Sequence, residues 1–229
     1  MNFIDLLIKK DKKLEPSFNK VSIGLNCQFI GLANIEIGEG SSIGDNSWLN
    51  VCIRDEKVRM KIGKTVLVGR QSMISCADLV EIGDYNVLAP RVYISNTDHR
   101  YEDLTKPILL QGIPEDRKML IEENCWFGIN TVIMGAITIG RGSVVAANSV
   151  VNKSLPPFVV VAGNPFKVIK MYNSKDKQWE FIKSEDHYKK LLEYRESYPI
   201  LSREEYNYLL HESNFKEIDP LIAGGNIHI

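Results

Sequence analysis

Residues 121–151 read IEENCW FGINTV IMGAIT IGRGSV VAANSV V, with an apolar residue at every sixth position. A period of six matches neither the 3.6-residue turn of an α-helix nor the two-residue alternation of a β-strand. It does match a solenoid of short strands joined by tight corners, in which three hexads of about eighteen residues close one triangular coil. This stretch therefore predicts a hexapeptide β-helix.

The same period recurs upstream in three further runs. Half of the sixteen hexads carry glycine in second place, and the fifth place is usually small or β-branched. We expect the first residues to point inward, the glycines to permit corner angles that a side chain would forbid, and the small fifth residues to fit where the walls converge. The alternative, a sandwich of short strands, requires strict alternation and turn clusters that are absent here. The upstream first places are Ile23, Phe29, Ile37, Ile43, Ile62, Val68, Ile74, Ile82, Leu88 and Ile94.

The breaks in the period define the expected organisation. Residues 1–20 are predicted to be an N-terminal capping segment, and residues 21–170 the repeat region with an extruded loop at 99–120. Residues 171–229 are predicted to be a helical extension. Its first helix is expected at 176–196, and Ser202 opens a capping box for a second. Both helices are expected to cover the end of the solenoid.

Composition excludes several classes of protein. The 229 residues include 28 Lys plus Arg and 29 Asp plus Glu, so the near-neutral charge gives no general attraction to nucleic acid. No apolar run approaches the roughly 20 residues that span a bilayer, and the first ten residues are not ordered like a secretory signal. A cytoplasmic protein is expected. Its four cysteines form no CxxC pair, so no metal site is predicted and the thiols are expected to be reduced.

Five stretches between residues 94 and 170 carry a resemblance to a known family: NTDHRY from Asn96, PILLQG from Pro107, CWFGIN from Cys125, AANSVV from Ala146 and AGNPFKVIK from Ala162. Their order and spacing resemble the hexapeptide-repeat O-acetyltransferases that act on maltose, galactosides, xenobiotics and polysaccharides, with the strongest likeness to capsule and lipopolysaccharide O-acetyltransferases. The resemblance implies a left-handed parallel β-helix, although crossovers are usually right-handed. It also implies a homotrimer, with acetyl-CoA in a groove between subunits and the loop reaching toward the neighbouring subunit.

Acetyl transfer to a hydroxyl requires a general base, and histidine suits that task near neutral pH. His99 is the one histidine in the repeat region, and it matches the family's catalytic base. Asp98 and Asp78 are candidates to orient its ring. Part of the family also has an Asn about two coils earlier, on the acceptor or the oxyanion, where this chain has Gly69 and Gln71. The oxyanion donor is therefore unassigned, and a backbone N–H is a reasonable substitute.

The resemblance assigns further residues to the two substrates. Lysines at matching positions are expected to meet the phosphates of the cofactor, because charge-assisted hydrogen bonds are the strong ones. The cofactor-binding candidates are Trp126, Gly128, Ala147, Lys153, Lys167 and Lys170, and the substrate-binding candidates are Asp78, Asn96, Tyr101 and Gln111.

The predicted function is acetyl-CoA-dependent O-acetylation of a sugar hydroxyl on a surface polysaccharide or its precursor, by direct transfer. Cys125 occupies a small fifth place and should point inward, so an acetyl-enzyme on its sulfur is disfavoured. The alternatives are N-acetylation of a nucleotide-linked amino sugar and a non-catalytic scaffold. A solenoid carbonic anhydrase would need three metal-binding histidines where the repeats supply one. The acceptor sugar, its hydroxyl, its polymeric or lipid-linked state and the role of the extension stay open.

Overall fold

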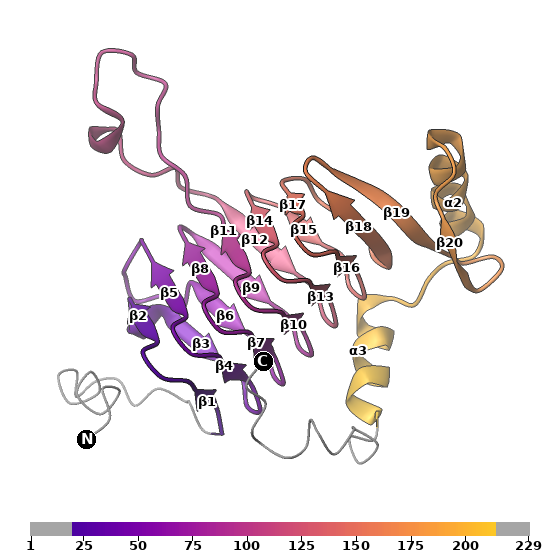
Figure 1. Ribbon diagram of the computed structural model, residues 1–229, viewed down its shortest axis with the longest axis horizontal. Helices are drawn as coiled ribbons and strands as arrows, with labels where there is room; N and C mark the ends of the chain where they lie inside the picture. Colours follow the sequence, from indigo (N-terminus) through magenta and orange to yellow (C-terminus); the bar gives the residue numbers. More distant parts are fainter. Residues whose placement is uncertain (1–19, 214–229) are drawn as a thin grey trace.

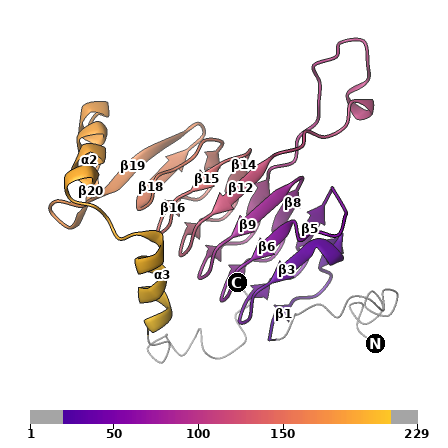
Figure 2. The same cartoon turned by 180° about the vertical axis from the view of Figure 1, so that it is seen from behind.

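The computed structural model describes residues 20–213 and consists of three sheets that share one core (Figures 1 and 2). From β1 to β17 consecutive strands enter the sheets in rotation, so each strand pairs in parallel with the strand one coil away, whereas β19 and β20 at the end of sheet A pair antiparallel. Sheet A contains β1 (Ser22–Ile23), β4 (Ser42–Ile43), β7 (Leu67–Val68), β10 (Val87–Leu88), β13 (Trp126–Phe127), β16 (Val144–Val145), β18 (Val159–Gly163), β19 (Phe166–Asn173) and β20 (Gln178–Phe181). Sheet B contains β2 (Gln28–Ile30), β5 (Trp48–Val51), β8 (Met73–Cys76), β11 (Tyr93–Ser95), β14 (Val132–Met134) and β17 (Val150–Val151). Sheet C contains β3 (Ile35–Ile37), β6 (Met60–Ile62), β9 (Leu79–Ile82), β12 (Lys118–Ile121) and β15 (Thr138–Ile139).

The hexad rule for inward-facing residues is confirmed. Every first-place residue from Ile37 to Val151 is buried, and Ile23 and Phe29 of the first coil are half-buried against the same core. Equivalent residues pair across neighbouring coils, as Ile94 does with Ile74 and Ile133. Stacked aliphatic side chains thus fill the interior, and their burial stabilises each coil through its neighbours.

The expected reason for the second-place glycines is wrong. None of them has a positive φ; a Cβ on Gly140 would instead lie 2.2 Å from the backbone N of Pro157 in the next coil. The left-handed corner angle falls in the fourth place, for example at Asn46 (φ 59°), Asn130 (φ 60°) and Asn148 (φ 59°). Asparagine tolerates that conformation and shares the fourth place with glycines such as Gly40 and Gly142, whereas the second-place glycines stand where two backbones approach closely.

The predicted helix at 176–196 is wrong in its first part. β19 and β20 form an antiparallel hairpin, and the first helix of the extension, α2, spans Glu185–Ser197. The hairpin extends sheet A past the expected boundary at residue 170, and α2 packs on β19 beyond the last coil (Figure 1). Polar Gln178 and Glu180 alternate with Trp179 and Phe181 along β20, and this period of two is typical of a strand rather than of the predicted helix.

The predicted second helix is confirmed as α3 (Arg203–Glu212), with the capping box between Ser202 and Glu205. It does not cover the end of the solenoid. α3 lies beside the corners between sheets C and A, where Arg203, Tyr206 and His211 contact Glu123, Asn124 and Tyr85.

The expected N-terminal cap at 1–20 lies almost wholly outside the described residues, as does the tail after residue 213. Within residues 20–213, no helix is both long enough and apolar enough to cross a membrane. The chain leaves the wall after β11 and rejoins it at Lys118, slightly before the expected loop end at 120. Two short 3-10 turns complete the elements, η1 (Leu32–Asn34) and η2 (Ile108–Leu110).

Candidate active site

A loop of residues 97–117 leaves the corner between sheets B and C, and its root is fixed by two residues. Asn96 is fully buried: its Oδ1 accepts from the Ala77 N–H, and its Nδ2 donates to the carbonyls of Leu79 and Arg117. Arg117 returns the contact from the far end of the loop by donating from Nε to the Asn96 carbonyl at 2.9 Å. Both ends of the loop are therefore held together, and Asn96, a predicted substrate-binding residue, lies in the wall rather than in the open.

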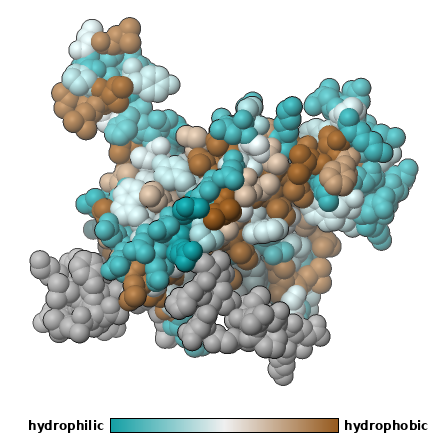
Figure 3. Space-filling model, in the orientation of Figure 1, coloured by the Kyte–Doolittle hydropathy of each residue, from teal (hydrophilic) through white to brown (hydrophobic). Residues whose placement is uncertain are grey.

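The loop is ordered by its own side chains. Gln111 donates from Nε2 to the carbonyls of Asp103 and Lys106 and accepts from the Asp103 N–H. The outer surface is apolar, since Leu104 is 96% exposed and Leu109 81% exposed. Figure 3 shows this brown surface on the projecting loop, away from the body of the molecule. A self-supporting loop with exposed leucines has the character of an interaction surface.

His99 lies at the root of this loop and is exposed. Its backbone N–H donates to Asp98 Oδ1 at 2.9 Å, and Asp98 Oδ2 lies 3.5 Å from Arg117 Nη1. Within the described part of the chain, no group is hydrogen-bonded to the His99 imidazole. Asp98 thus shapes the backbone at the loop root, and the ring is open to an incoming substrate.

A polar cluster that includes Thr97, two residues before His99, lies at the ends of three neighbouring strands of sheet B. Asn50 Nδ2 donates to Ser75 Oγ (3.3 Å) and to Cys52 Sγ (3.2 Å), and Ser75 Oγ is 2.9 Å from Thr97 Oγ1. Asn50 is thus two strands from the strand that leads to His99. Sequence reasoning missed it because the irregular segment after Val51 lengthens that coil, which places Asn50 and Ser75 25 residues apart.

Asp78 lies in a separate ionic cluster. Arg59 donates from Nη1 to Asp78 Oδ1 at 2.7 Å. It also binds Asp55 in a bidentate manner, with Nε donating to Oδ1 at 2.9 Å and Nη2 donating to Oδ2 at 2.6 Å. These bonds hold the pKa of Asp55 at about 2. The Asp78 carboxylate is therefore engaged by arginine, and no contact with His99 is seen.

The predicted cofactor residues lie on several elements of the chain. Lys153 follows β17, the last strand of sheet B, and is exposed. Gly128 and Ala147 lie together at the corners between sheets A and B, where a Cβ on Gly128 would meet the Ala147 N at 2.5 Å. Trp126 points outward from sheet A and is 56% exposed. Lys167 and Lys170 are on β19, and Lys170 Nζ lies 4.3 Å from the centre of the Phe181 ring. Within this chain these residues are therefore spread over sheets A and B rather than gathered at the root of the loop.

The outer faces of the three sheets differ in character. The outward column of sheet C is charged in its first coils, with Glu36, Lys61 and Glu81 in register, and continues with Leu120 and Thr138. The outward columns of sheets A and B begin with polar residues (Ser22 and Ser42 on A, Gln28 on B) and are apolar from there on: Leu67, Val87, Trp126, Val144 and Val160 on sheet A and Trp48, Met73, Tyr93, Val132 and Val150 on sheet B. Two partly exposed apolar faces on one prism are the features of an interaction surface.

Two other kinds of chemistry find little support in the site. Burial raises the pKa of the Cys125 thiol to about 12, so the nucleophilic thiolate is scarce. Among residues 20–213, no three His, Cys, Asp or Glu side chains gather closely enough to hold a metal ion.

Comparison with known proteins places this architecture in a family. The family described as bacterial transferase hexapeptide (six repeats) matches residues 118–153. The galactoside O-acetyltransferase of Escherichia coli is 33% identical over 148 residues, covering 62% of this chain and 68% of the relative. WbbJ of Escherichia coli, named as a lipopolysaccharide biosynthesis O-acetyl transferase, is 32% identical over 165 residues, covering 68% of this chain and 84% of the relative.

Two further comparisons define the limits of the likeness. A probable acetyltransferase of Mycobacterium tuberculosis is 34% identical over 149 residues, or 65% of this chain, but this match spans only 47% of that relative's length. A solved mutant of AntD, an N-acyltransferase from Bacillus cereus in complex with dTDP and coenzyme A, has a TM-score of 0.56 and 18% identity, covering 86% of this chain and 100% of that one. The latter likeness concerns the fold alone. On the matches to the two Escherichia coli proteins, which each cover more than two thirds of the relative, the chain belongs to the hexapeptide-repeat acetyltransferase family.

Proposed function

We propose that the protein transfers an acetyl group from acetyl-CoA to a sugar hydroxyl of a surface polysaccharide or its precursor. The observation that carries this proposal is the open imidazole of His99 at the anchored root of an apolar loop. Relatives named for galactoside and lipopolysaccharide O-acetylation support the substrate class. The unpaired state of all four cysteines accords with a cytoplasmic enzyme.

The chemistry is direct transfer. His99 takes the proton of the acceptor hydroxyl as its oxygen attacks the thioester carbonyl, the C–S bond breaks, and coenzyme A leaves as a thiol once it is protonated. We assign Asn50 to the acceptor or the oxyanion, because it lies in the same sheet and its amide faces the polar cluster beside the loop. Tyr101, exposed two residues after His99, is available to pack against the sugar. Asp98, Asn96 and Gln111 act as supports of the loop, and Asp78 stays with Arg59.

The complete site lies between subunits of a homotrimer with left-handed coils. In a cyclic trimer each interface joins two different faces, and the apolar faces of sheets A and B supply such a pair. That arrangement brings Trp126 of one subunit toward His99 of the next. Acetyl-CoA would lie along the groove, with Lys153, Lys167 and Lys170 near its phosphates and Gly128 and Ala147 leaving space for the pantetheine arm.

The test is acetyl transfer by the purified full chain, measured as thiol release with acetyl-CoA and matched hydroxyl and amine sugars. His99→Ala should lower turnover by about 10²–10⁴-fold, the contribution of a general base, while trimer mass and coenzyme A binding persist. His211→Ala serves as the control, because that ring lies on α3 beside Tyr85. Near-normal turnover of His99→Ala would show that His99 is not the general base.

The acceptor screen separates the alternatives. Transfer to amine acceptors alone would favour the N-acetyltransferase reading, which a 47% identity over 64 residues with a tetrahydropyridine-dicarboxylate N-acetyltransferase of Clostridium perfringens keeps open. If coenzyme A does not change the Tm of the intact trimer, the solenoid would instead be a non-catalytic scaffold.

A further inference from the structure

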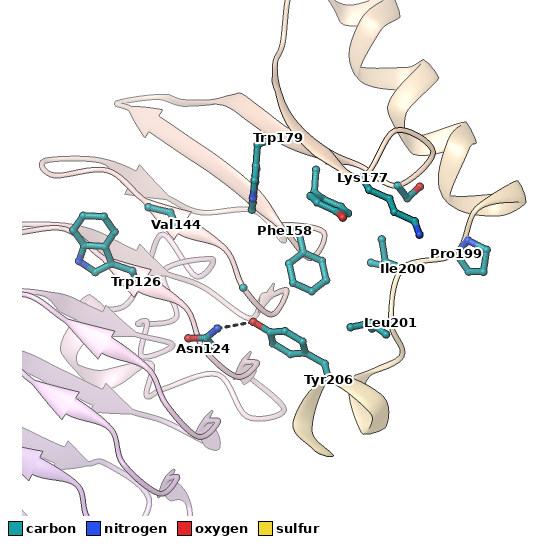
Figure 4. Close-up of a pocket in the computed structure, with 13 residues that line it drawn as sticks. Asn124, Trp126, Val144, Phe158, Lys177, Trp179, Pro199, Ile200, Leu201 and Tyr206 are labelled. Carbon is teal, nitrogen blue, oxygen red and sulfur yellow. Dashed lines mark hydrogen bonds between the residues drawn. The ribbon is translucent and has the colours of Figure 1, made fainter. Parts of the chain in front are cut away.

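A cavity of about 680 Å³ lies where the C-terminal extension meets the last coils of sheet A (Figure 4). Trp126 and Val144 of the solenoid form one edge, the β19–β20 hairpin forms the roof, and the segment 199–201 with Tyr206 of α3 closes the far side. Its volume falls within the roughly 300–1,000 Å³ of pockets that hold small molecules. The extension thus builds a concave site that the repeats alone would lack.

The cavity wall is a connected set of aromatic rings. The ring centres of Tyr206 and Phe158 are 5.2 Å apart in an edge-to-face contact, and those of Phe158 and Tyr172 are 6.2 Å apart. The ring centres of Tyr172 and Trp179 are 5.9 Å apart, again edge to face. Trp179 remains 43% exposed despite these contacts. The rings therefore offer a broad apolar surface that the protein itself does not fill.

Two polar side chains from the hairpin turn complete the lining. Ser174 is 9% exposed, and its Oγ is buried without a hydrogen-bond partner within the described residues. Lys177 lies opposite the rings at the cavity edge and is the one cation in the lining. Because the Ser174 Oγ is itself buried, Lys177 is the polar side chain of this turn that a ligand in the cavity can reach.

Each wall of the cavity is anchored. The buried amide of Asn173 donates to Asp176 and Glu180 and accepts from the N–H groups of Lys175 and Asp176, which fixes the turn that carries Ser174. Arg141 donates to the Leu201 carbonyl, and the amide of Asn124 donates to the Tyr206 hydroxyl (Figure 4). Binding would therefore order few groups, which favours affinity.

We propose that this cavity binds a saccharide of two or more rings, as a second recognition site for the acceptor. A pyranose presents apolar C–H groups on its faces and hydroxyls at its edge, which matches aromatic walls with a few polar groups beside them. A coenzyme carries several phosphate charges, whereas the lining offers one cation, Lys177. The proposal rests on the proposed function only in taking the saccharide to be the acceptor.

Such a site selects the class of substrate. Trp179 lies on β20 and Phe158 precedes β18, both in the C-terminal part of sheet A, whereas His99 follows β11 of sheet B, so within one subunit these rings lie apart from the base. A chain of several sugars can occupy the cavity while another of its residues reaches a catalytic base. An oligosaccharide or polymer is therefore the favoured acceptor over a free monosaccharide.

The experiment measures direct binding to the full chain by tryptophan fluorescence and saturation-transfer NMR. The probes are maltohexaose, a hexasaccharide of hyaluronan, glucose and coenzyme A. A hexasaccharide should bind the wild type more tightly than glucose, and Trp179→Ala should weaken it by about tenfold or more. Tyr208→Ala is the matched control, because Tyr208 is an exposed aromatic of α3 outside the cavity lining.

Two further variants make the outcome decisive. Lys177→Met tests the cavity without removing an aromatic, should Trp179→Ala fold poorly, and it too should weaken hexasaccharide binding. His99→Ala should lower transfer by about 10²–10⁴-fold yet bind the hexasaccharide normally, so loss of the proposed function and loss of this site are distinguishable. The proposal is overturned if neither hexasaccharide binds, if both cavity variants bind like the wild type, or if coenzyme A displaces the saccharide from the cavity.

Discussion

Arg203 of α3 forms a bidentate ion pair with Glu123 of the solenoid, in which Nε and Nη2 donate hydrogen bonds to the carboxylate at 2.6–3.1 Å. Glu123 is only 4% exposed. Burial alone would raise the pKa of Glu123, but the hydrogen bonds from Arg203 and Asn207 outweigh it, and that pKa lies below its usual value. The position of α3, and with it the Tyr206 side chain that lines the cavity, therefore depends on this ion pair.

Replacing Arg203 with Met should destabilise the protein at pH 7 by about 2 kcal/mol, or roughly 4–8 °C in Tm. The cost is below the roughly 3–5 kcal/mol of a fully buried pair, because the Arg203 side chain is 39% exposed. Arg70→Met, at an exposed arginine of the solenoid, should change little. Thermal melting followed by circular dichroism checks both variants.

The direction in which pH changes the stability of Arg203→Met follows from the pKa of Glu123. In the wild type the lowered pKa of Glu123 contributes stability above the unfolded pKa that is lost as pH falls. In Arg203→Met the charge is buried without its partner, so its pKa rises, and mild acid should reduce the difference between the two proteins. A difference that grows from pH 7 to pH 5 would contradict this account.

The pair of Arg59 and Asp55 predicts a second acid effect, at lower pH. Because hydrogen bonds from Arg59 hold the pKa of Asp55 at about 2, its contribution to stability is full above its unfolded pKa and is lost as pH falls toward 2. Asp55→Asn should lower Tm at pH 7, and the deficit should vanish by pH 2. Glu56→Gln, at a neighbouring exposed carboxylate, is the control in melts from pH 7 to pH 2. A constant deficit would contradict the assignment.

The hexad period predicted the buried residues of the core because one side chain in six must point inward, whatever the corners do. It could not assign a role to glycine, since a close backbone approach and a left-handed angle both favour that residue. Only coordinates show that Gly140 faces Pro157 in the next coil, whereas Asn130 and Asn148 adopt the positive φ.

The site was predictable only where it is local in sequence. His99 stands beside the break that starts the loop, so position and residue type coincide. Asn50 depends on coil length, which the segment after Val51 changes, and spacing alone therefore pointed to Gly69 and Gln71 instead. The cavity was not predictable, because Phe158, Trp179 and Tyr206 come from separate elements that meet only in the folded chain.

The close approach of coils predicts a steric cost at Gly140. A Cβ there would lie 2.2 Å from Pro157 N and 2.6 Å from Pro156 C, and both are backbone atoms that cannot swing aside. Gly140→Ala should cost about 3 kcal/mol, or roughly 6–12 °C in Tm. At Gly112 in the loop a Cβ meets nothing within 4 Å, so Gly112→Ala should cost only the strain of its positive φ, about 1 kcal/mol. Equal losses at the two positions would show that backbone angle, not coil contact, decides the glycines.

Direct transfer predicts that the thiol of Cys125 is dispensable. With a pKa of about 12, about one thiol in 10⁵ is ionised at pH 7, and the side chain is 1% exposed, so attack on a thioester is disfavoured both chemically and sterically. Cys125→Ala should keep turnover within about twofold and lose about 1 kcal/mol of stability from the small cavity it leaves. Intact-protein mass spectrometry after mixing with acetyl-CoA should show no acetyl adduct on the wild type. An adduct that disappears in Cys125→Ala together with activity would replace direct transfer by a covalent route, because sulfur would then carry the acetyl group between the two substrates.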